Sequence, residues 1–270
     1  MRIANYCSNP EETEKLNAFI AALNAPEEPL LFKTSGSTGA PKEYWFSLTQ
    51  VKISAQQTID TFKLTQKDVL LCPFSMDYVA AKMMVARAYF LNATLVFTGP
   101  ISNPFFIDFE EMVSFGALVP IQLQNALKDE EATKKINSTK QLIIGGALVS
   151  EQLEKDISEK VKSEIYHTYG MTETLTHVAL RKLGVNPPTY KALKGVSVKV
   201  NSASALMVKS PVNQEWLQTN DLVELNGDTF KWIGRTDLVI NSGGIKIQIE
   251  LLESKFNNLL SDYQLFICGI

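Results

Sequence analysis

The sequence predicts an α/β protein: mainly parallel sheets covered by helices, with an antiparallel or barrel-like β unit, followed by the start of a small C-terminal α+β domain. Two observations support this fold class. Between residues 30 and 166, short apolar runs alternate with longer amphipathic stretches, the pattern of parallel strands joined by helices. After Gly195, short strands follow one another with only turns between them. We therefore expect a large domain over residues 1–235, and a hinge with the beginning of a small, incomplete domain over 236–270.

The first elements follow from cap signals and apolar periodicity. A helix is expected to start at Ser8-Asn9-Pro10, because cap-forming residues precede an early proline, and to end near Leu23. Ser47 and Gln50 have the spacing of a capping box, which predicts a helix over Leu48–Phe62. Further strands are predicted at Leu30–Lys33, Val69–Cys72, Thr94–Phe97, Ala117–Val119, Leu142–Ile144 and Glu164–Tyr166, and further helices at Val79–Phe90, Ile121–Lys128 and Ser150–Val161.

The later elements are shorter and richer in turns. Asn226-Gly227-Asp228 is typical of a hairpin turn between two strands. Gly234-Arg235-Thr236-Asp237 marks the boundary to the C-terminal segment, in which a helix is predicted over Glu250–Leu260. The strands of this part are predicted at Val196–Val200, Leu206–Val208, Leu222–Leu225 and Phe230–Ile233.

The composition narrows the class of protein. Of 270 residues, 45% are hydrophobic and 20% are charged, as in ordinary globular proteins. A net charge of −3 argues against nucleic-acid binding through a broad basic surface. The apolar runs are far too short to span a bilayer, and residues 1–5 lack the apolar core of a signal peptide. We therefore expect a cytoplasmic protein without membrane insertion; the sequence does not indicate its oligomeric state.

The segment from Thr34 to Lys42 carries the strongest chemical signal. It combines two glycines, four hydroxyl side chains and a lysine directly after an apolar run. Glycines let the backbone approach a ligand closely, and N–H groups, hydroxyls and a lysine suit phosphate oxygens. The alternative is an exposed Ser/Gly linker, since such composition is common in linkers. The candidate phosphate-binding residues are Thr34, Ser35, Gly36, Ser37, Thr38, Gly39 and Lys42.

Two later motifs favour a nucleotide site over a linker. Tyr169-Gly170-Met171-Thr172-Glu173 follows a predicted strand, at the sheet edge where α/β proteins bind ligands. A tyrosine can stack on a base, and a carboxylate can hold Mg²⁺. Asp221 and Arg235, on neighbouring turns, could hold the two hydroxyls of a ribose. Taken singly, each motif is also compatible with ordinary turns.

Together and in this order, the three motifs resemble the adenylate-forming acyl-CoA synthetase and adenylation-domain superfamily. The resemblance covers nearly the whole chain and includes Gly234-Arg235, Asp237, Ser242-Gly243-Gly244 and Glu250. Finer features are similar to short-form o-succinylbenzoate–CoA ligases of menaquinone biosynthesis. These are the segments Pro73 to Ala88, Val119 to Leu123, Ile144 to Ala147, Thr172 to His177 and Ser242 to Gly244.

The resemblance implies an ATP-dependent ligase reaction in two steps. A carboxylate attacks the α-phosphate of ATP to form an acyl-adenylate, and the thiol of CoA then displaces AMP. It implies that Lys42, Thr172 and Glu173 serve catalysis, with Thr172 on the α-phosphate and Glu173 on Mg²⁺. It further implies that Asp221 and Arg235 hold the ribose and that Asp237 is a hinge. Gly145, Gly146, Ala147, Tyr169 and Gly170 would border the nucleotide.

The acid substrate needs its own recognition residues. A dianionic aromatic diacid requires a positive or hydrogen-bonding partner beyond its reacting carboxylate. Lys82 and Arg87 in the pocket segment are the candidates, although long basic side chains on such a helix often reach solvent. Tyr78 and His177 are also expected near the acid, whereas a structural role is equally compatible with His177 and is expected for His167.

The chain also departs from the family pattern, and this leaves alternatives open. Family members continue to a complete small domain with a Pro-x-Gly-Lys lysine, and neither Lys246 nor Lys255 matches its position. We therefore expect ATP binding but slow adenylation by the chain as given. A ligase for another aryl acid and a carrier-protein-loading adenylation domain are alternatives of the same class. A non-catalytic nucleotide-binding remnant is an alternative of a different class.

Overall fold

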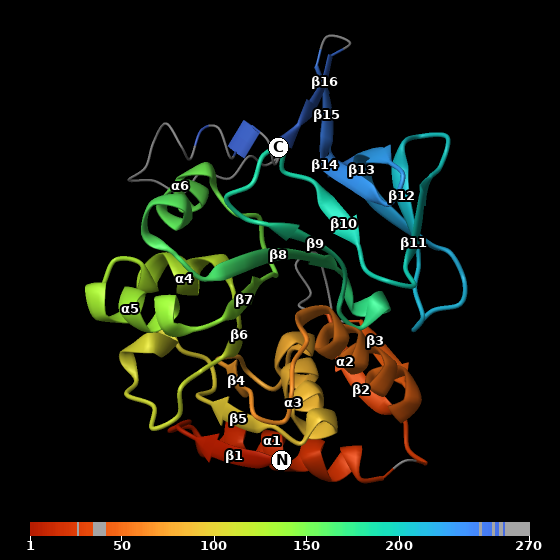
Figure 1. Cartoon of the computed structure of the whole chain (residues 1–270). Helices are drawn as coiled ribbons and strands as arrows, with labels where there is room; N and C mark the ends of the chain where they lie inside the picture. Colours follow the sequence, from red (N-terminus) through yellow and green to blue (C-terminus); the bar gives the residue numbers. More distant parts are fainter. Residues whose placement is uncertain (26, 35–41, 243–244, 250–251, 254–255, 257–270) are drawn as a thin grey trace.

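The structure, a computed structural model (Figure 1), describes residues 1–25, 27–34, 42–242, 245–249, 252–253 and 256. In these ranges, twelve strands form one continuous sheet in the order β1-β5-β4-β6-β7-β8-β9-β10-β14-β13-β12-β11. The first six strands in this order are parallel to one another. They are β1 (Arg2–Asn5), β5 (Thr94–Phe97), β4 (Val69–Cys72), β6 (Phe115–Leu118), β7 (Gln141–Ile144) and β8 (Glu164–Gly170).

The other six strands continue the same sheet in antiparallel pairing. They are β9 (His177–Lys182), β10 (Tyr190–Ala192), β14 (Thr229–Arg235), β13 (Leu217–Asn226), β12 (Ala205–Lys209) and β11 (Ser197–Val200). Two separate hairpins accompany the sheet, β2 (Leu30–Lys33) with β3 (Glu43–Phe46) and β15 (Val239–Ser242) with β16 (Ile245–Gln248). The predicted fold class, parallel strands with helices followed by an antiparallel unit, is thus confirmed.

Helices cover the parallel strands on both sides (Figure 1). One group is α1 (Pro10–Leu23), α2 (Leu48–Phe62) and α3 (Val79–Leu91), and the other is α4 (Pro120–Ala126), α5 (Glu130–Ser138) and α6 (Glu151–Lys160). Strand side chains alternate between the two apolar clusters: Leu70 and Cys72 join the cluster of the first group, and Leu71 joins that of the second. Burial on both faces explains why these strands are continuous apolar runs.

Local signals place the helix starts as predicted. Asn9 caps α1 by accepting a hydrogen bond from the Glu11 amide, and Ser47 forms the predicted capping box with Gln50 at α2. Ser150 caps α6 rather than belonging to it. The prediction of β6 was shifted by two residues at its start. The sequence analysis did not predict β1, β3, β9, β10, β15, β16 or α5. The predicted helix Glu250–Leu260 lies largely outside the described residues.

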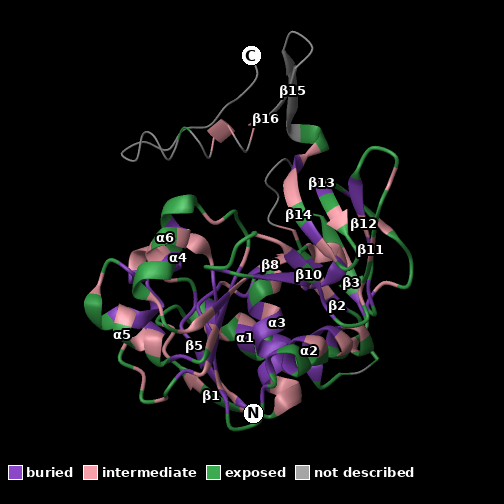
Figure 2. Ribbon diagram, turned by 45° about the horizontal axis from the view of Figure 1, so that its top comes forward, coloured by how far each residue is buried: buried purple, intermediate pink, exposed green. Residues whose placement is uncertain are grey.

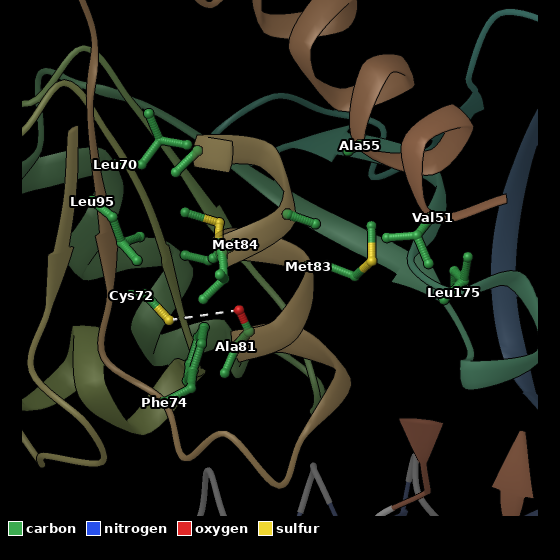
Figure 3. Close-up of a cluster of buried hydrophobic side chains, with 14 of the residues drawn as sticks. Val51, Ala55, Leu70, Cys72, Phe74, Ala81, Met83, Met84, Leu95 and Leu175 are labelled. Atoms are coloured by element: carbon green, nitrogen blue, oxygen red, sulfur yellow. Dashed lines mark hydrogen bonds between the residues drawn. The ribbon is translucent and has the colours of Figure 1, made fainter. Parts of the chain in front are cut away.

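Helix α3 is deeply buried along most of its length. It packs between the sheet and α2, as the buried purple ribbon in Figure 2 and the close-up in Figure 3 show. Met83 points toward Val51 and Leu175, while the Cys72 thiol lies 3.9 Å from the Ala81 carbonyl on the opposite side (Figure 3). This burial accounts for the largely apolar sequence of the helix, in which Lys82 and Arg87 are the two charged residues. In the described part of the chain, every helix is too short or too polar to cross a bilayer.

Candidate functional site

A cavity of about 500 Å³ lies at the carboxyl ends of β6, β7 and β8. This is the edge at which open α/β sheets bind ligands. Its wall is largely apolar, with polar groups from the segment that follows β8 and from α3. Residues that line it include Phe74, Val79, Gly145, Gly146, Thr172 and His177.

The β2–β3 hairpin brings the ends of the predicted phosphate-binding segment together. The Thr34 amide donates to the Lys42 carbonyl at 3.0 Å, and the Lys42 amide donates to the Thr34 hydroxyl at 3.0 Å. Lys33, one residue earlier, lines the cavity and pairs with Glu43 at 3.0 Å. The segment therefore begins and ends beside the cavity. Ser35, Gly36, Ser37, Thr38 and Gly39 lie outside the described residues.

The glycines after β7 bring backbone to the cavity wall. A Cβ on Gly145 would lie 2.5 Å from the Thr168 hydroxyl, and Gly146 has a φ of +84°, which disfavours other residues. The ring of His167 lies 3.0 Å from the Ala147 carbonyl, which can only accept, so Nε2 carries the proton. Burial lowers the pKa of His167 to about 4, which keeps the ring neutral. His167 thus fixes one edge of this loop.

The segment after β8 turns sharply into the cavity. Gly170 is required there, because a Cβ would lie 2.5 Å from the His177 Cα. Thr172 lines the cavity, and Glu173 follows it in a 3₁₀ turn, Thr172–Thr174. The Tyr44 hydroxyl donates to Glu173 Oε1 at 2.7 Å, and this bond raises the pKa of Tyr44 to about 12. Asn213 donates a hydrogen bond to the Glu173 carbonyl.

Glu173 could take part in a metal site only together with a ligand. The described residues contain no cluster of three or more His, Cys, Asp or Glu side chains able to hold a metal ion. A single carboxylate is nevertheless a fitting donor for Mg²⁺, which usually binds one or two carboxylates together with substrate phosphates. The donor set at Glu173 therefore fits a metal that arrives with a nucleotide.

The predicted ribose-binding residues lie opposite each other on β13 and β14. Asp221 and Arg235 are partners in the strand ladder. The Asp221 carboxylate accepts from the Tyr169 hydroxyl at 2.5 Å and from the Trp232 indole at 3.0 Å. Burial, with Asp221 beside it, raises the pKa of Tyr169 well above its usual range. Arg235 binds the carboxylate of Asp237 in a bidentate pair, at 2.9 and 2.7 Å.

Arg87 is a buried cation at the cavity wall. Its side chain is 2% exposed, and burial lowers its pKa to about 10. Its Nη2 donates to the Thr176 hydroxyl at 2.8 Å, its Nη1 lies 3.3 Å from the Met84 sulfur, and its Nε has no hydrogen-bond partner. Among the described residues, no carboxylate forms an ion pair with it. A buried charge normally has such a partner, so this guanidinium is poised for an anion.

His177 also lines the cavity, close to Arg87. Its Nδ1 is 3.2 Å from the Thr176 hydroxyl and its Nε2 is 3.3 Å from the Thr58 hydroxyl. Burial, and secondarily the charge of Arg87, lowers the pKa of His177 well below its ordinary value. The two hydroxyls and the neutral ring thus form a polar chain that ends on Arg87. The sequence reading missed Thr58, Thr176 and Tyr44, because no local pattern indicates contacts across more than a hundred residues or between separate elements.

The other two predicted acid-binding residues differ in position. Tyr78 lines the cavity and is 51% exposed. Lys82 is not part of the cavity wall: its ammonium donates to the Leu31 carbonyl at 2.8 Å and lies over the rings of Phe19 and Phe32. Burial lowers the pKa of Lys82. Of the two basic candidates on α3, the structure brings only Arg87 to the cavity.

The chain is similar to known acid–CoA ligases. A 2-succinylbenzoate–CoA ligase of Haemophilus influenzae is 28% identical over 87% of this chain and 54% of its own length. An indoleacetate–CoA ligase of Aromatoleum aromaticum is 24% identical over 88% of this chain and 52% of its own. The chain thus spans about half the length of the curated relatives it matches.

A solved structure and a family model extend the comparison. The structure is an acyl-CoA synthetase (AMP-forming)/AMP-acid ligase II-like protein of Dyadobacter fermentans, 31% identical, with a TM-score of 0.78 over 95% of this chain and 74% of that one. The AMP-binding enzyme model matches residues 9–211, which contain the cavity and most of the sheet. The chain therefore belongs to the AMP-binding enzyme family.

Proposed function

We propose that this chain binds ATP and a carboxylic acid for an acid–CoA ligase reaction, and that the acid is o-succinylbenzoate. The observation that carries the substrate assignment is Arg87, a buried guanidinium at the cavity with no described carboxylate partner. An aryl diacid would supply the missing charge with its second carboxylate while its ring packs on the apolar wall. The names of relatives such as the Haemophilus influenzae ligase support the same substrate.

The proposed reaction assigns work to particular side chains. The reacting carboxylate attacks the α-phosphorus of ATP, the bond to the β-phosphate oxygen breaks, and pyrophosphate leaves; the thiol of CoA then attacks the acyl carbonyl and AMP leaves. Thr172, which lines the cavity, is assigned to the α-phosphate, and Lys42 with the segment before it is assigned to the outer phosphates. Mg²⁺ held by Glu173 would supply positive charge to the phosphates.

The nucleotide's sugar would lie where Asp221 of β13 pairs with Arg235 at the end of β14. Asp221 is held by Tyr169 and Trp232, so its carboxylate is oriented before a ribose arrives. Gly145, Gly146 and Ala147 would border the base, with Tyr169 against it. Arg235 would reach the ribose by exchanging part of its pair with Asp237. We infer that Asp237 marks a hinge between a large domain of residues 1–235 and the segment 236–270.

A second candidate substrate is an aromatic monoacid. The apolar wall, which includes Phe74, Ile143 and Leu175, suits an aromatic ring, and one relative is an indoleacetate–CoA ligase. A monoacid would leave Arg87 without a charge partner. For this reason we favour the diacid.

Calorimetry with the 270-residue chain tests the proposal. The chain is titrated with ATP in the presence of Mg²⁺ and then with o-succinylbenzoate, benzoate or a fatty acid, and pyrophosphate release is followed in parallel. We expect ATP binding, and acid binding that is strongest for o-succinylbenzoate. Equal affinity for benzoate and o-succinylbenzoate would favour an aromatic monoacid as the substrate. The absence of ATP binding would overturn the nucleotide assignment.

A further inference from the structure

Tyr44 contacts the carboxylate to which the proposed function assigns the metal. It lies on β3, two residues after Lys42, whereas Glu173 lies 129 residues further along the chain. The hydroxyl of Tyr44 donates to Glu173 Oε1 at 2.7 Å. Among the described residues, no hydrogen bond reaches the other carboxylate oxygen, Oε2. One oxygen of Glu173 is therefore fixed, and the other remains available.

The backbone of the same turn is held independently. Asn213 binds the Glu173 carbonyl, and the Thr174 hydroxyl bonds to the carbonyls of Met171 and Thr176, at 2.9 and 2.8 Å. These contacts fix where the turn lies. Only Tyr44 fixes the direction of the carboxylate, since it makes the side-chain hydrogen bond that the described structure gives Glu173.

We propose that Tyr44 is a positioning residue that orients Glu173 for Mg²⁺ bound with ATP. This inference rests on the proposed function. Tyr44 belongs to β3, the strand that follows the phosphate-binding segment. Its hydrogen bond therefore joins the β2–β3 hairpin to the turn carrying Glu173. A carboxylate that is already oriented loses less side-chain freedom when it binds a metal, which strengthens binding. The phenol has no charge of its own and leaves the negative charge of Glu173 in place.

The test compares ATP affinity with and without metal. Titration calorimetry measures the dissociation constant of ATP in excess Mg²⁺ and in EDTA, for the unmodified chain and for Tyr44→Phe. We expect Tyr44→Phe to weaken binding about tenfold in Mg²⁺, the size of effect typical of residues that orient metal ligands, and to leave binding in EDTA unchanged. Thermal unfolding without ligands shows whether the variant is folded.

Tyr6→Phe is the matched control. Tyr6 also donates its hydroxyl to a carboxylate, Glu111 Oε2 at 2.9 Å, and it lies next to β1 at the far edge of the sheet. Its loss should change neither titration. Equal weakening of Tyr44→Phe in Mg²⁺ and in EDTA would identify a merely structural role, and unchanged or tighter Mg²⁺–ATP binding would also overturn the inference.

Glu173→Gln separates failure of this inference from failure of the proposed function. If ATP binding by the unmodified chain is insensitive to Mg²⁺, or if Glu173→Gln keeps the full Mg²⁺ dependence, the metal role of Glu173 is wrong. If both tests support Glu173 but Tyr44→Phe behaves like the unmodified chain, only the role of Tyr44 is wrong.

Discussion

Arg87 and Arg181 are two buried arginines, each beside a buried histidine. Among the described residues, Arg181 has a carboxylate partner and Arg87 has none. Arg181 on β9 pairs with Glu154 at 2.7 Å and lies over the ring of Tyr190. Arg87 on α3 has a hydroxyl and a sulfur as partners and faces the cavity. Both have an Nε without a hydrogen-bond partner, so this feature alone does not identify a binding site. The difference between them is that, among the described residues, only Arg181 has a carboxylate partner; this supports the proposal that Arg87 binds an anion, because a charge balanced inside the fold has no need of a ligand.

The two neighbouring histidines, His167 and His177, also differ in their hydrogen-bond partners. His167 bonds to Ala147 and Tyr190 and so links the cavity loop to the antiparallel strands. His177 bonds to two threonine hydroxyls, one of which holds Arg87. Within the described structure the charge of Arg181 is thus balanced by Glu154, whereas Arg87 has no carboxylate beside it, as the proposed acid site requires. The predictions below test this difference.

The largest expected effect is on acid selectivity. Arg87→Met should weaken o-succinylbenzoate binding about 10³-fold, or roughly 4 kcal/mol, because the second carboxylate loses its buried partner. Benzoate binding should change little. Arg181→Met serves as the matched control and should affect both acids alike. Calorimetric titration of the two acids measures the ratio; an equal loss for both acids in Arg87→Met would contradict the assignment.

The next effect concerns the stability of the fold at low pH. The pKa of His167 is about 4 in the fold, through burial and the charge of Arg181, and about 6.5 in the unfolded chain. The unfolded chain therefore binds more protons between these values. The stabilisation from the neutral ring is complete above pH 6.5 and is lost as pH falls to 4, by about 3 kcal/mol.

Urea unfolding at pH 7, 5.5 and 4.5 measures this loss. His167→Gln, which cannot gain a proton, should show a shallower decline in unfolding free energy than the unmodified chain over the same range. The same urea unfolding series on His177→Gln measures the contribution of the buried histidine beside Arg87, for comparison with His167→Gln. An unchanged slope in His167→Gln would contradict the lowered pKa.

A smaller effect is expected at Thr176. Thr176→Val removes the hydroxyl that accepts from Arg87 and should weaken o-succinylbenzoate binding about tenfold, with benzoate unaffected. Thr176→Ser keeps the hydroxyl and should restore the affinity. Identical behaviour of the valine and serine variants in the same titrations would show that the hydroxyl does not position Arg87.

The smallest effect is expected at Lys82. Its ammonium binds the Leu31 carbonyl outside the cavity, so Lys82→Met should leave acid selectivity unchanged and alter the unfolding free energy by about 1 kcal/mol or less. Competition titrations and urea unfolding check the two parts. A selective loss of diacid binding would place Lys82 in the acid site and weaken the contrast between it and Arg87.

The sequence allowed the parallel strands, the helix caps and the family to be predicted, because these depend on local patterns. Continuous apolar runs and cap residues are set within a few positions of the chain, as at Ser47 and Gln50. The strands that were missed, such as β9 and β10, carry polar or charged residues and form only because a neighbouring strand pairs with them. The roles of Ser35 to Gly39 stay predictions, since these residues lie outside the described structure.

By itself, the sequence determined the order of most elements between residues 10 and 166, the caps of α1 and α2, and the resemblance to adenylate-forming enzymes. Which of Lys82 and Arg87 lies at the cavity was decided only by the tertiary structure. Five residues apart, they lie roughly 140° from each other around a helix, and the sequence does not say which side faces the cavity. Packing of α3 against the sheet and α2 settles it: Arg87 is turned to the cavity and Lys82 to the β2–β3 hairpin. The same long-range packing brings Tyr44 to Glu173.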